Sequence, residues 1–208
     1  MFIQIIQGKC RDQDKVHALG DKWLRDVSPG AIGWLGGTYG VTDDGTFVGV
    51  VRFDSREAAM ANSARPEQSA WWAEMEKCFD GSVEFHDAEK VMTMLDGGSD
   101  RAGFVQVIRG RIDDPAVIER GLDEMSRIMR EKRPEIIGGT IAVEPDGTFT
   151  ETVAFTNEAE ARDGEARAMP VDGPVKHLMQ DWDRLTHDLT YLDLHHPWFA
   201  SAPAATSR

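Results

Sequence analysis

Apolar and polar residues alternate along the chain in a pattern that predicts strands and helices in a definite order. Residues 2–8, FIQIIQG, form a β-prone run with apolar side chains on both faces, as in a central strand covered on both sides. Asp12 or Asp14 is expected to cap the helix that follows over residues 13–27, which Ser28-Pro29-Gly30 ends. Its apolar residues recur at helical spacing: Val16, Leu19, Trp23 and Val27.

Two more β-prone runs, residues 32–41 and 46–53, flank an Asp-Gly turn and predict a β-hairpin. Ser55 is typical of a helix N-cap, so a helix is expected to follow it. A second helical piece is expected over residues 67–79 after Pro66, ended by Gly81, with a last short strand over residues 83–87. The order β-α-β-β-α-β is that of a ferredoxin-like unit.

The hairpin sequence occurs twice. Gly36 to Phe47 reads GGTYGVTDDGTF, and Gly138 to Phe149, 102 residues later, reads GGTIAVEPDGTF. FVQVIRG from Phe104 likewise repeats FIQIIQG. A repeat at one fixed spacing indicates a duplicated domain. We therefore expect four segments: repeat 1 over residues 1–95, a linker over 96–102, repeat 2 over 103–195, and a C-terminal tail over 196–208 with a disordered end.

The second repeat shows the same order of elements. A helix is expected after Pro115, and Asn157 takes the capping place of Ser55. The second helix of this repeat is expected to break around Met169-Pro170 and Gly173-Pro174 and to resume as far as Trp182. The predicted strands are residues 136–143, 148–155 and 189–194.

Each predicted sheet has four strands with both helices on one face, which leaves the other face bare. We expect the two bare faces to pack against each other. The predicted fold class is therefore α+β, with two tandem ferredoxin-like units packed sheet-to-sheet as an intramolecular α+β barrel. With its element order, repeated first strand and repeated GGT…DGTF, the chain resembles the dimeric α+β barrel superfamily in its tandem-fused form.

The superfamily hosts many chemistries, so the resemblance specifies the fold better than the activity. It implies a small-molecule-binding protein, and the leading interpretation is a cofactor-independent monooxygenase-like enzyme that acts on an aromatic or quinone-type substrate, similar to the antibiotic-biosynthesis monooxygenases. One alternative is a non-catalytic ligand-binding or stress-related protein. Another is haem binding or degradation.

Quinone-forming members of the superfamily activate oxygen through the substrate's own acidic phenol, helped by Asn, Trp, Tyr and Arg side chains. The resemblance implies comparable roles here for Asn62, Trp72, Tyr39 and Arg52. Haem-degrading members use an Asn on the first strand, a Trp on the second helix and a following His. Here the first strand offers Gln4 and Gln7 but no Asn, and His86 lies 14 positions after Trp72, so this match is weaker.

The orientation of the strands selects further candidates. If Ile3, Ile5, Phe47, Val51 and Phe53 face the helices, the alternating side chains point to the barrel interior: Gln4, Val48, Val50 and Arg52, with Gln106, Thr150, Thr152 and Ala154 in repeat 2. Gln4 and Gln106 are then either ligand-facing groups or bonded to each other or to water across the interior.

His86, in VEFHD, is expected to point away from the helices, close to Arg52. It is a candidate general base or haem ligand, or else a partly exposed strand histidine. Of Trp71 and Trp72, one is expected in the core and one could wall a pocket for a flat substrate. The candidate catalytic residues are Arg52 and His86. The candidate substrate-binding residues are Gln4, Tyr39, Asn62, Trp72 and Gln106.

Charge and composition limit the classes of partner that the protein is expected to bind. The formal net charge of −13 argues against nucleic acid or an anionic membrane as a partner. With no run of 18 apolar residues and no signal-peptide pattern, a cytoplasmic protein is expected. Cys10 and Cys78 are expected to be thiols in a reducing compartment. No metal-binding or nucleotide-binding motif is found, so no cofactor is expected, and the chain is expected to be a monomer with an internal pseudo-dimer or a homodimer.

Overall fold

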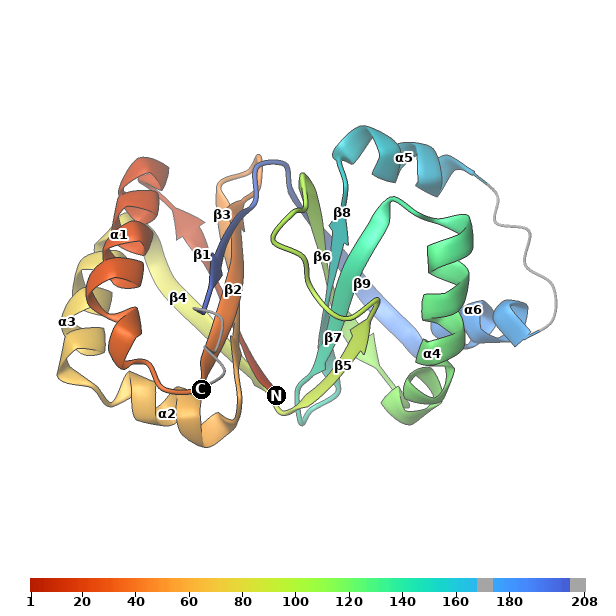
Figure 1. The fold of residues 1–208 in the computed structure, drawn as a ribbon, viewed down its shortest axis with the longest axis horizontal. Coiled ribbons are helices and arrows are strands. Elements are labelled where there is room, and N and C mark those ends of the chain that lie inside the picture. Colours follow the sequence, from red (N-terminus) through yellow and green to blue (C-terminus); the bar gives the residue numbers. More distant parts are fainter. Residues whose placement is uncertain (168–173, 203–208) are drawn as a thin grey trace, which may run out of the picture. The chain divides into compact units, whose positions relative to one another are not determined.

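The computed structural model describes residues 1–167 and 174–202, and the chain divides into two compact units (Figure 1). Unit 1 consists of Met1–Glu89 and the segment that begins at Trp198, and unit 2 is Lys90–Pro197. Within the described residues, each unit has one antiparallel sheet of five strands together with its own helices. The α+β class and the two tandem ferredoxin-like units are therefore confirmed.

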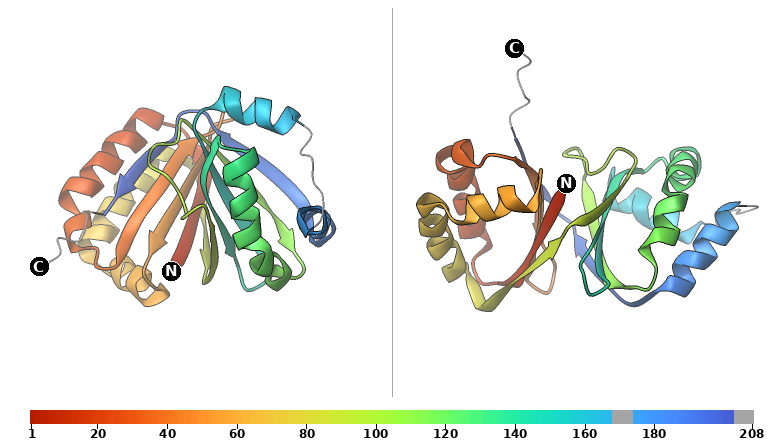
Figure 2. Two further views of the ribbon diagram at one scale, coloured as in Figure 1. Left: turned by 45° about the vertical axis from the view of Figure 1, so that its right-hand side comes forward. Right: turned by 90° about the horizontal axis from the view of Figure 1, so that it is seen from below.

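Unit 1 begins with strand β1 and helix α1, and its strand order across the sheet is β10-β2-β3-β1-β4. Its helices α1 and α3 lie along the same face of this sheet (Figures 1 and 2). The elements are β1 (Phe2–Cys10), α1 (Gln13–Asp26), the 3-10 turn η1 (Ser28–Gly30), β2 (Trp34–Val41), β3 (Thr46–Phe53), α2 (Arg56–Ser63), α3 (Pro66–Met75), the 3-10 turn η2 (Glu76–Cys78), β4 (Phe79–Ala88) and β10 (Trp198–Ser201).

Unit 2 repeats this plan with the strand order β5-β7-β8-β6-β9. Helices α4 and α6 pack together on one face of its sheet (Figure 1). The elements are β5 (Lys90–Met94), β6 (Phe104–Ile112), α4 (Pro115–Lys132), β7 (Ile136–Val143), β8 (Thr148–Phe155), α5 (Glu158–Ala166), α6 (Pro174–Leu185) and β9 (Thr186–Leu194). The predicted break between α5 and α6 falls largely on residues 168–173, outside the described residues.

The repeated Asp-Gly turns are built alike in the two units. Gly45 and Gly147 adopt positive φ angles of 81° and 87°, which a glycine reaches without steric cost. The preceding aspartates accept a hydrogen bond from a threonine N–H, at 3.2 Å for Asp44 and 2.9 Å for Asp146. The sequence repeat is therefore a repeat of turn geometry, and it fixes the register of both hairpins.

The helix N-caps also follow the sequence. Asp12, rather than Asp14, accepts a hydrogen bond from the backbone N–H of Lys15 at 3.0 Å. Ser55 and Asn157 cap α2 and α5 in the same way, at 3.2 Å and 2.9 Å. Each cap satisfies one of the backbone donors that the first turn of a helix leaves unpaired.

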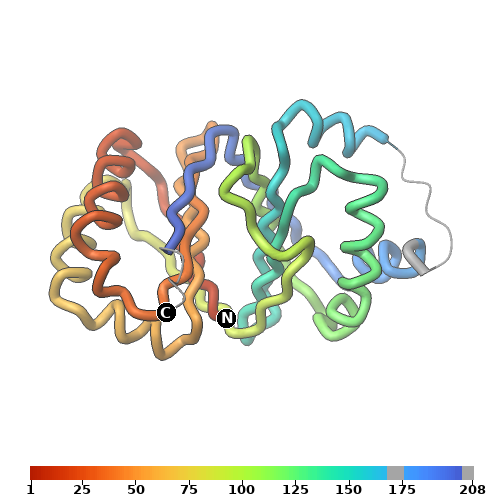
Figure 3. The backbone as a smooth tube through the Cα atoms, viewed as in Figure 1, coloured from red at the N-terminus to blue at the C-terminus, as the bar shows by residue number. Residues whose placement is uncertain are grey.

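The edge strands β5 and β10 were not predicted from the sequence. After β4 the chain leaves unit 1 and adds β5 to the edge of the unit 2 sheet, where Met92 pairs with Ile141. After β9 it returns and adds β10 beside β2, where Trp198 pairs with Tyr39 (Figure 3). Residues 198–201 of the predicted tail are thus a strand, and the predicted disorder at its end falls on residues 203–208, which are not described.

The second helix of unit 1 is shorter than predicted. The segment expected to be helical over residues 67–79 ends as α3 at Met75 and continues as η2. Gly81 does not end a helix, because it lies inside β4 with a φ angle of 78°. After η2, strand β4 begins at Phe79, which pairs with Cys10. This is four residues before the start predicted from the apolar pattern.

The register of β1 corrects the orientation predicted for its side chains. Phe2 pairs with Phe53 and Gln4 with Val51, so these four side chains share the helix-covered face. Ile3 and Ile5 lie on the opposite face, and the prediction that they face the helices is wrong. The physical reason is that FIQIIQG is apolar on both faces, so hydrophobicity alone does not select one.

The helix-covered face of unit 2 contains one acidic residue near its middle. Glu151 on β8 pairs with Ile141 and Ile108, and it follows the alternation of Phe149 and Val153 on this face. Its side chain is 8% exposed, and burial is the one influence on its carboxyl, with no hydrogen bond or charge from another described residue acting on it. Burial raises the pKa of Glu151 to about 7.

Cys10 and Cys78 are both free thiols, and Cys78 is buried. Burial raises the pKa of each thiol, so both are protonated at neutral pH. No helix in the described part of the chain is long and apolar enough to cross a membrane. The packing of one bare sheet face on the other stays a prediction.

We expect Glu151→Gln to stabilise the protein in a pH-dependent way. The folded state holds the Glu151 proton up to about pH 7, whereas the unfolded chain releases it near its ordinary value, so the carboxyl destabilises the fold increasingly as the pH rises between these values. The variant should gain about 3 kcal/mol in free energy of unfolding at about pH 8 and almost nothing at about pH 4.

Urea unfolding followed by circular dichroism over this pH range checks the expectation. Glu76→Gln is the matched control, because Glu76 is exposed, and it should change the free energy of unfolding by less than about 0.5 kcal/mol. Equal gains for both variants, or a gain that grows as the pH falls, would contradict the interpretation.

Candidate functional site

Unit 1 has a cavity of about 210 Å³ between its sheet and helices α1, α2 and α3. Aromatic side chains dominate its wall: Trp23, Trp34, Tyr39, Phe47, Phe53, Trp71, Trp72 and Trp198. An engineered cavity of about 150 Å³ is enough to bind benzene, so this one has room for a substituted ring or two fused rings.

The aromatic rings hold one another in place. The Trp23 ring meets Trp34 edge-on with centroids 4.8 Å apart, and it meets Trp71 at 6.3 Å. On the other side of the cavity, Tyr39 stacks with Trp198 at 6.1 Å. Such pairs are worth roughly 0.5–1.5 kcal/mol each beyond the area that they bury, so the wall is rigid before any ligand enters.

Glycines make room for these rings and for the cavity. A side chain at Gly37 or Gly49 would collide with, or press on, the Tyr39 ring, at 2.2 Å and 3.1 Å from the nearest ring or hydroxyl atom. Gly20 lines the cavity from α1, and a Cβ atom there would meet no atom within 4 Å. Glycine in the middle of a helix costs about 1 kcal/mol relative to alanine, and here it leaves the cavity unfilled.

Two hydrogen-bond donors lie in the wall. The indole N–H of Trp34 is buried and has no hydrogen-bond partner among the described residues. Burial raises the pKa of Tyr39 to about 12, although the nearby Arg52 charge opposes this, so the phenol keeps its proton at neutral pH. Buried donors normally have partners, and an oxygen atom of a ligand is one that both could use.

The amide side chains at the cavity are held by neighbours. Gln4 donates to Asp87 at 2.9 Å, Asn62 accepts from Arg65 at 3.0 Å, and Gln68 accepts from the Trp23 indole at 2.6 Å. Each amide group has two N–H donors and one oxygen acceptor. One such contact fixes the orientation of the side chain and leaves its other polar atoms available to a ligand.

Helix α1 also brings two ionisable side chains to this cavity, His17 and Asp21. His17, on α1, packs its ring against Trp198 with centroids 3.8 Å apart. A neutral imidazole can take a proton from a phenol near neutral pH. The cavity therefore combines a flat apolar wall, two donors and a base.

The structure brings together four of the five residues predicted to bind substrate. Gln4, Tyr39, Asn62 and Trp72 all line the unit 1 cavity. Gln4 reaches it from the face opposite to the one expected, because of the register of β1. Their roles in binding stay a prediction.

Arg52 and His86, the predicted catalytic residues, lie on the other face of the same sheet. Arg52 pairs with Ile3 and His86 with Ile5, so both side chains point away from the helices. Arg52 donates to Thr38 at 3.4 Å, and His86 lies 3.4 Å from Glu84. Neither lines the aromatic cavity, and their catalytic roles stay a prediction.

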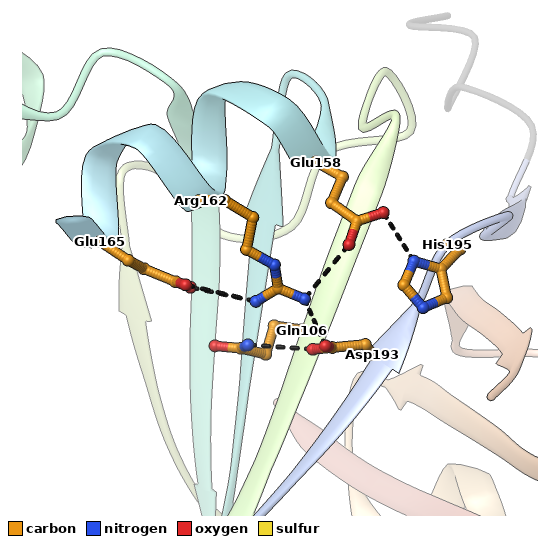
Figure 4. A network of polar contacts seen from close by, with 6 residues as sticks. All are labelled: Gln106, Glu158, Arg162, Glu165, Asp193 and His195. Carbon is orange, nitrogen blue, oxygen red and sulfur yellow. Dashed lines mark hydrogen bonds and ion pairs between the residues drawn. The ribbon is translucent and has the colours of Figure 1, made fainter. Parts of the chain in front are cut away.

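Gln106, the fifth predicted binding residue, belongs to a polar network in unit 2 (Figure 4). It donates to Asp193 at 2.9 Å, as Gln4 does to Asp87 in unit 1. Arg162 joins Asp193 to Glu158, and Glu158 lies 2.7 Å from His195. The hydrogen bond from His195 lowers the pKa of Glu158. Each glutamine is therefore bonded to an aspartate of its own unit, an arrangement absent from both sequence-based alternatives.

Sequence reasoning missed His17, Trp34, Gln68 and Trp198. His17 falls next to Val16 in the amphipathic helix, and its position on the helix face was a signal that could have found it. Trp198 follows the last predicted strand and is brought back to unit 1 only by β10, which no local pattern reveals.

Unit 2 has a second cavity, of about 200 Å³, in the equivalent place between its sheet and helices α4 and α6. Its wall is mostly aliphatic side chains and methionines, and Glu151 lies in it. Among the residues that the structure describes, no group of three His, Cys, Asp or Glu side chains could hold a metal ion.

No family model matches the sequence, and no curated protein matches it. Solved structures do match. A “putative monooxygenase” from Lactobacillus acidophilus has a TM-score of 0.69 at 13% identity, covering 93% of this chain and 92% of that one. A second “putative monooxygenase”, from Fusobacterium nucleatum, gives 0.68 at 7% identity, with coverages of 96% and 94%.

An “anthrone oxidase-like protein” matches over 100% of this chain and 96% of its own, with a TM-score of 0.60 at 11% identity. At such low identity the likeness establishes the fold. This chain has the tandem ferredoxin-like fold found in these monooxygenase-like structures.

Proposed function

We propose that the unit 1 cavity binds a small hydroxylated or quinone-type aromatic molecule and that the protein oxidises it with molecular oxygen, without a metal or flavin. The observation that carries the proposal is the cavity itself, a preformed space walled largely by aromatic side chains. Flat apolar walls with a few placed polar groups are typical of small-molecule sites.

The polar groups suit an aromatic molecule that carries oxygen. Tyr39 and Trp34 can donate to a quinone carbonyl or a phenolate, and His17 can accept the phenol proton. The phenolate then supplies electrons to oxygen. For 1-naphthol the balance is C10H8O plus O2 giving 1,4-naphthoquinone, C10H6O2, plus H2O, so no further reductant is needed.

The comparisons support the proposal at the level of fold. The structural neighbours carry the names “putative monooxygenase” and “anthrone oxidase-like protein”. The cavity volume of about 210 Å³ favours one or two rings over larger ligands. A haem is too large for it, so haem degradation is not favoured.

Non-catalytic ligand binding is the second candidate. It is favoured by one observation, namely that the side chains of Arg52 and His86 lie on the sheet face opposite the cavity. The two candidates share the binding site and differ in whether oxygen is consumed, so one set of experiments separates them.

Filling the space at Gly20 should block binding without harming the fold. We expect Gly20→Leu to weaken the binding of 1,4-naphthoquinone at least tenfold, while the helix gains roughly 0.8 kcal/mol from losing a glycine. Quenching of tryptophan fluorescence measures the affinity. Gly20→Ala is the control, since its methyl group adds helix stability but little volume; equal affinities for all three proteins would place the ligand elsewhere.

Replacing His17 should affect turnover more than binding. With 1-naphthol as substrate, we expect His17→Gln to lower the rate of oxygen consumption about a hundredfold, because the base that takes the phenol proton is lost. The affinity for 1,4-naphthoquinone should change less than about threefold, because no proton transfer is involved. Binding of naphthol by the unaltered protein with no oxygen uptake would reject the enzyme and leave the binding function.

The sequence-based candidates have their own test. We expect Arg52→Ala and His86→Ala to leave naphthoquinone affinity and oxygen uptake within about twofold of the unaltered protein, since neither side chain lines the cavity. A large loss of oxygen uptake in either variant, with binding unchanged, would restore the catalytic role predicted from the sequence.

A further inference from the structure

The unit 2 cavity differs in chemistry from the aromatic cavity of unit 1. Helix α4 contributes Ile118, Leu122, Met125 and Met129 to its wall, and strand β5 contributes Met94. Unbranched methionine side chains adapt to ligands of irregular shape, and aliphatic walls suit alkyl chains better than they suit stacked rings. The cavity of about 200 Å³ is large enough for a short alkyl chain.

Glu151 gives this apolar cavity a single deep polar group. Its carboxyl lies in the cavity wall between apolar neighbours, is 8% exposed, and has no partner among the described residues. A buried polar group without a partner costs about 1–3 kcal/mol, more when charged, so a protein gains stability by removing it. Glu151 therefore destabilises the protein when the cavity is empty, and a ligand that bonds to its carboxyl group would offset this cost.

The charge of the wall selects the kind of ligand. Among the described lining residues the ionisable side chains are two acids: Glu151 at depth, and Asp183 on α6, which is exposed. Helix α4 and strand β5 contribute apolar side chains to the wall, and no described Lys, Arg or His lines it. A carboxylate ligand would meet repulsion, whereas a cation would meet an acceptor that lacks a donor.

We infer that the unit 2 cavity is a second binding site, which takes a short aliphatic primary amine with its ammonium group on Glu151 and its alkyl chain among the methionines. The three N–H donors of an ammonium group match a carboxylate, and a charge-assisted hydrogen bond is roughly twice as strong as a neutral one. The site is independent of the function proposed for unit 1.

The same position in unit 1 explains why the two cavities differ. Gly49 stands where Glu151 stands in unit 2, and Tyr39 stands where Ile141 stands, as the paired registers of the two hairpins show. The glycine leaves space for the phenol ring, and the glutamate fills the equivalent space with a carboxyl group. Duplication has thus given one frame two sets of lining residues.

Binding of an amine should be linked to the proton of Glu151. Below about pH 7 the carboxyl is neutral, and it must release its proton before it pairs with an ammonium ion. The affinity for the amine should therefore fall by about tenfold per pH unit below this value, whereas the affinity for an alcohol should stay level. Asp183, the other acid of the wall, is exposed.

Isothermal titration calorimetry of the full chain with n-hexylamine, n-hexanol and n-hexanoate tests the inference. At about pH 8 we expect hexylamine to bind at least tenfold more tightly than hexanol, and hexanoate to bind most weakly. Glu151→Gln should reduce the preference of amine over alcohol to less than about threefold. Glu76→Gln is the matched control, and it should retain the preference because Glu76 is exposed and lies in unit 1, outside this cavity.

Gly20→Leu separates the two cavities, because it fills unit 1 and should leave amine binding unchanged. The ligand comparison and the pH profile need no variant, so the test does not depend on how Glu151→Gln folds. Equal affinity for amine and alcohol, no binding of either, a preference that survives Glu151→Gln, or one that disappears in Glu76→Gln or Gly20→Leu would each overturn the inference.

Discussion

The register of the two hairpins decides which side chains reach the cavities, and the rest of the structure depends on it. In a strand, neighbouring side chains point to opposite faces, so a slip of one residue would exchange the helix-covered face for the other. The turns at Gly45 and Gly147 prevent this slip, because each combines a left-handed glycine with an aspartate that accepts a backbone N–H. They hold Tyr39 in one cavity and Glu151 in the other.

The two units share one backbone frame but differ in the side chains that line their cavities, as expected after duplication and divergence. Both units keep the frame: the turns, the N-caps and the glutamine on the first strand that bonds to an aspartate on the last. They differ where the frame does not constrain the side chain, as at Gly49 and Glu151. One contact between an acid and a base is kept with the two partners exchanged, since Arg56 faces Glu89 in unit 1 and Glu158 faces His195 in unit 2.

Local signals in the sequence were sufficient for most of the fold and for part of the site. The Asp-Gly turns and the helix starts at Ser55 and Asn157 depend on neighbours in the chain, and they were predicted correctly. The orientation of Gln4 could not be chosen, because both faces of its strand are apolar. The strand at Trp198 was missed, because its pairing with Tyr39 joins residues far apart in the sequence. Glu151 was not predicted as a cavity residue, because the alternation of Phe149 and Val153 indicates an apolar face and does not show that an acid on this face is buried.

The exchanged edge strands also set an order of assembly during synthesis. Unit 2 is one continuous stretch, Lys90–Pro197, and it can complete its sheet as soon as β9 has left the ribosome. Unit 1 begins earlier but must wait for β10, so the half that is translated first is finished last. Until then β2 is an uncovered edge, the kind of surface on which nascent chains aggregate. The stack of Trp198 on Tyr39 is therefore the step that both closes the aromatic cavity and ends this vulnerable period.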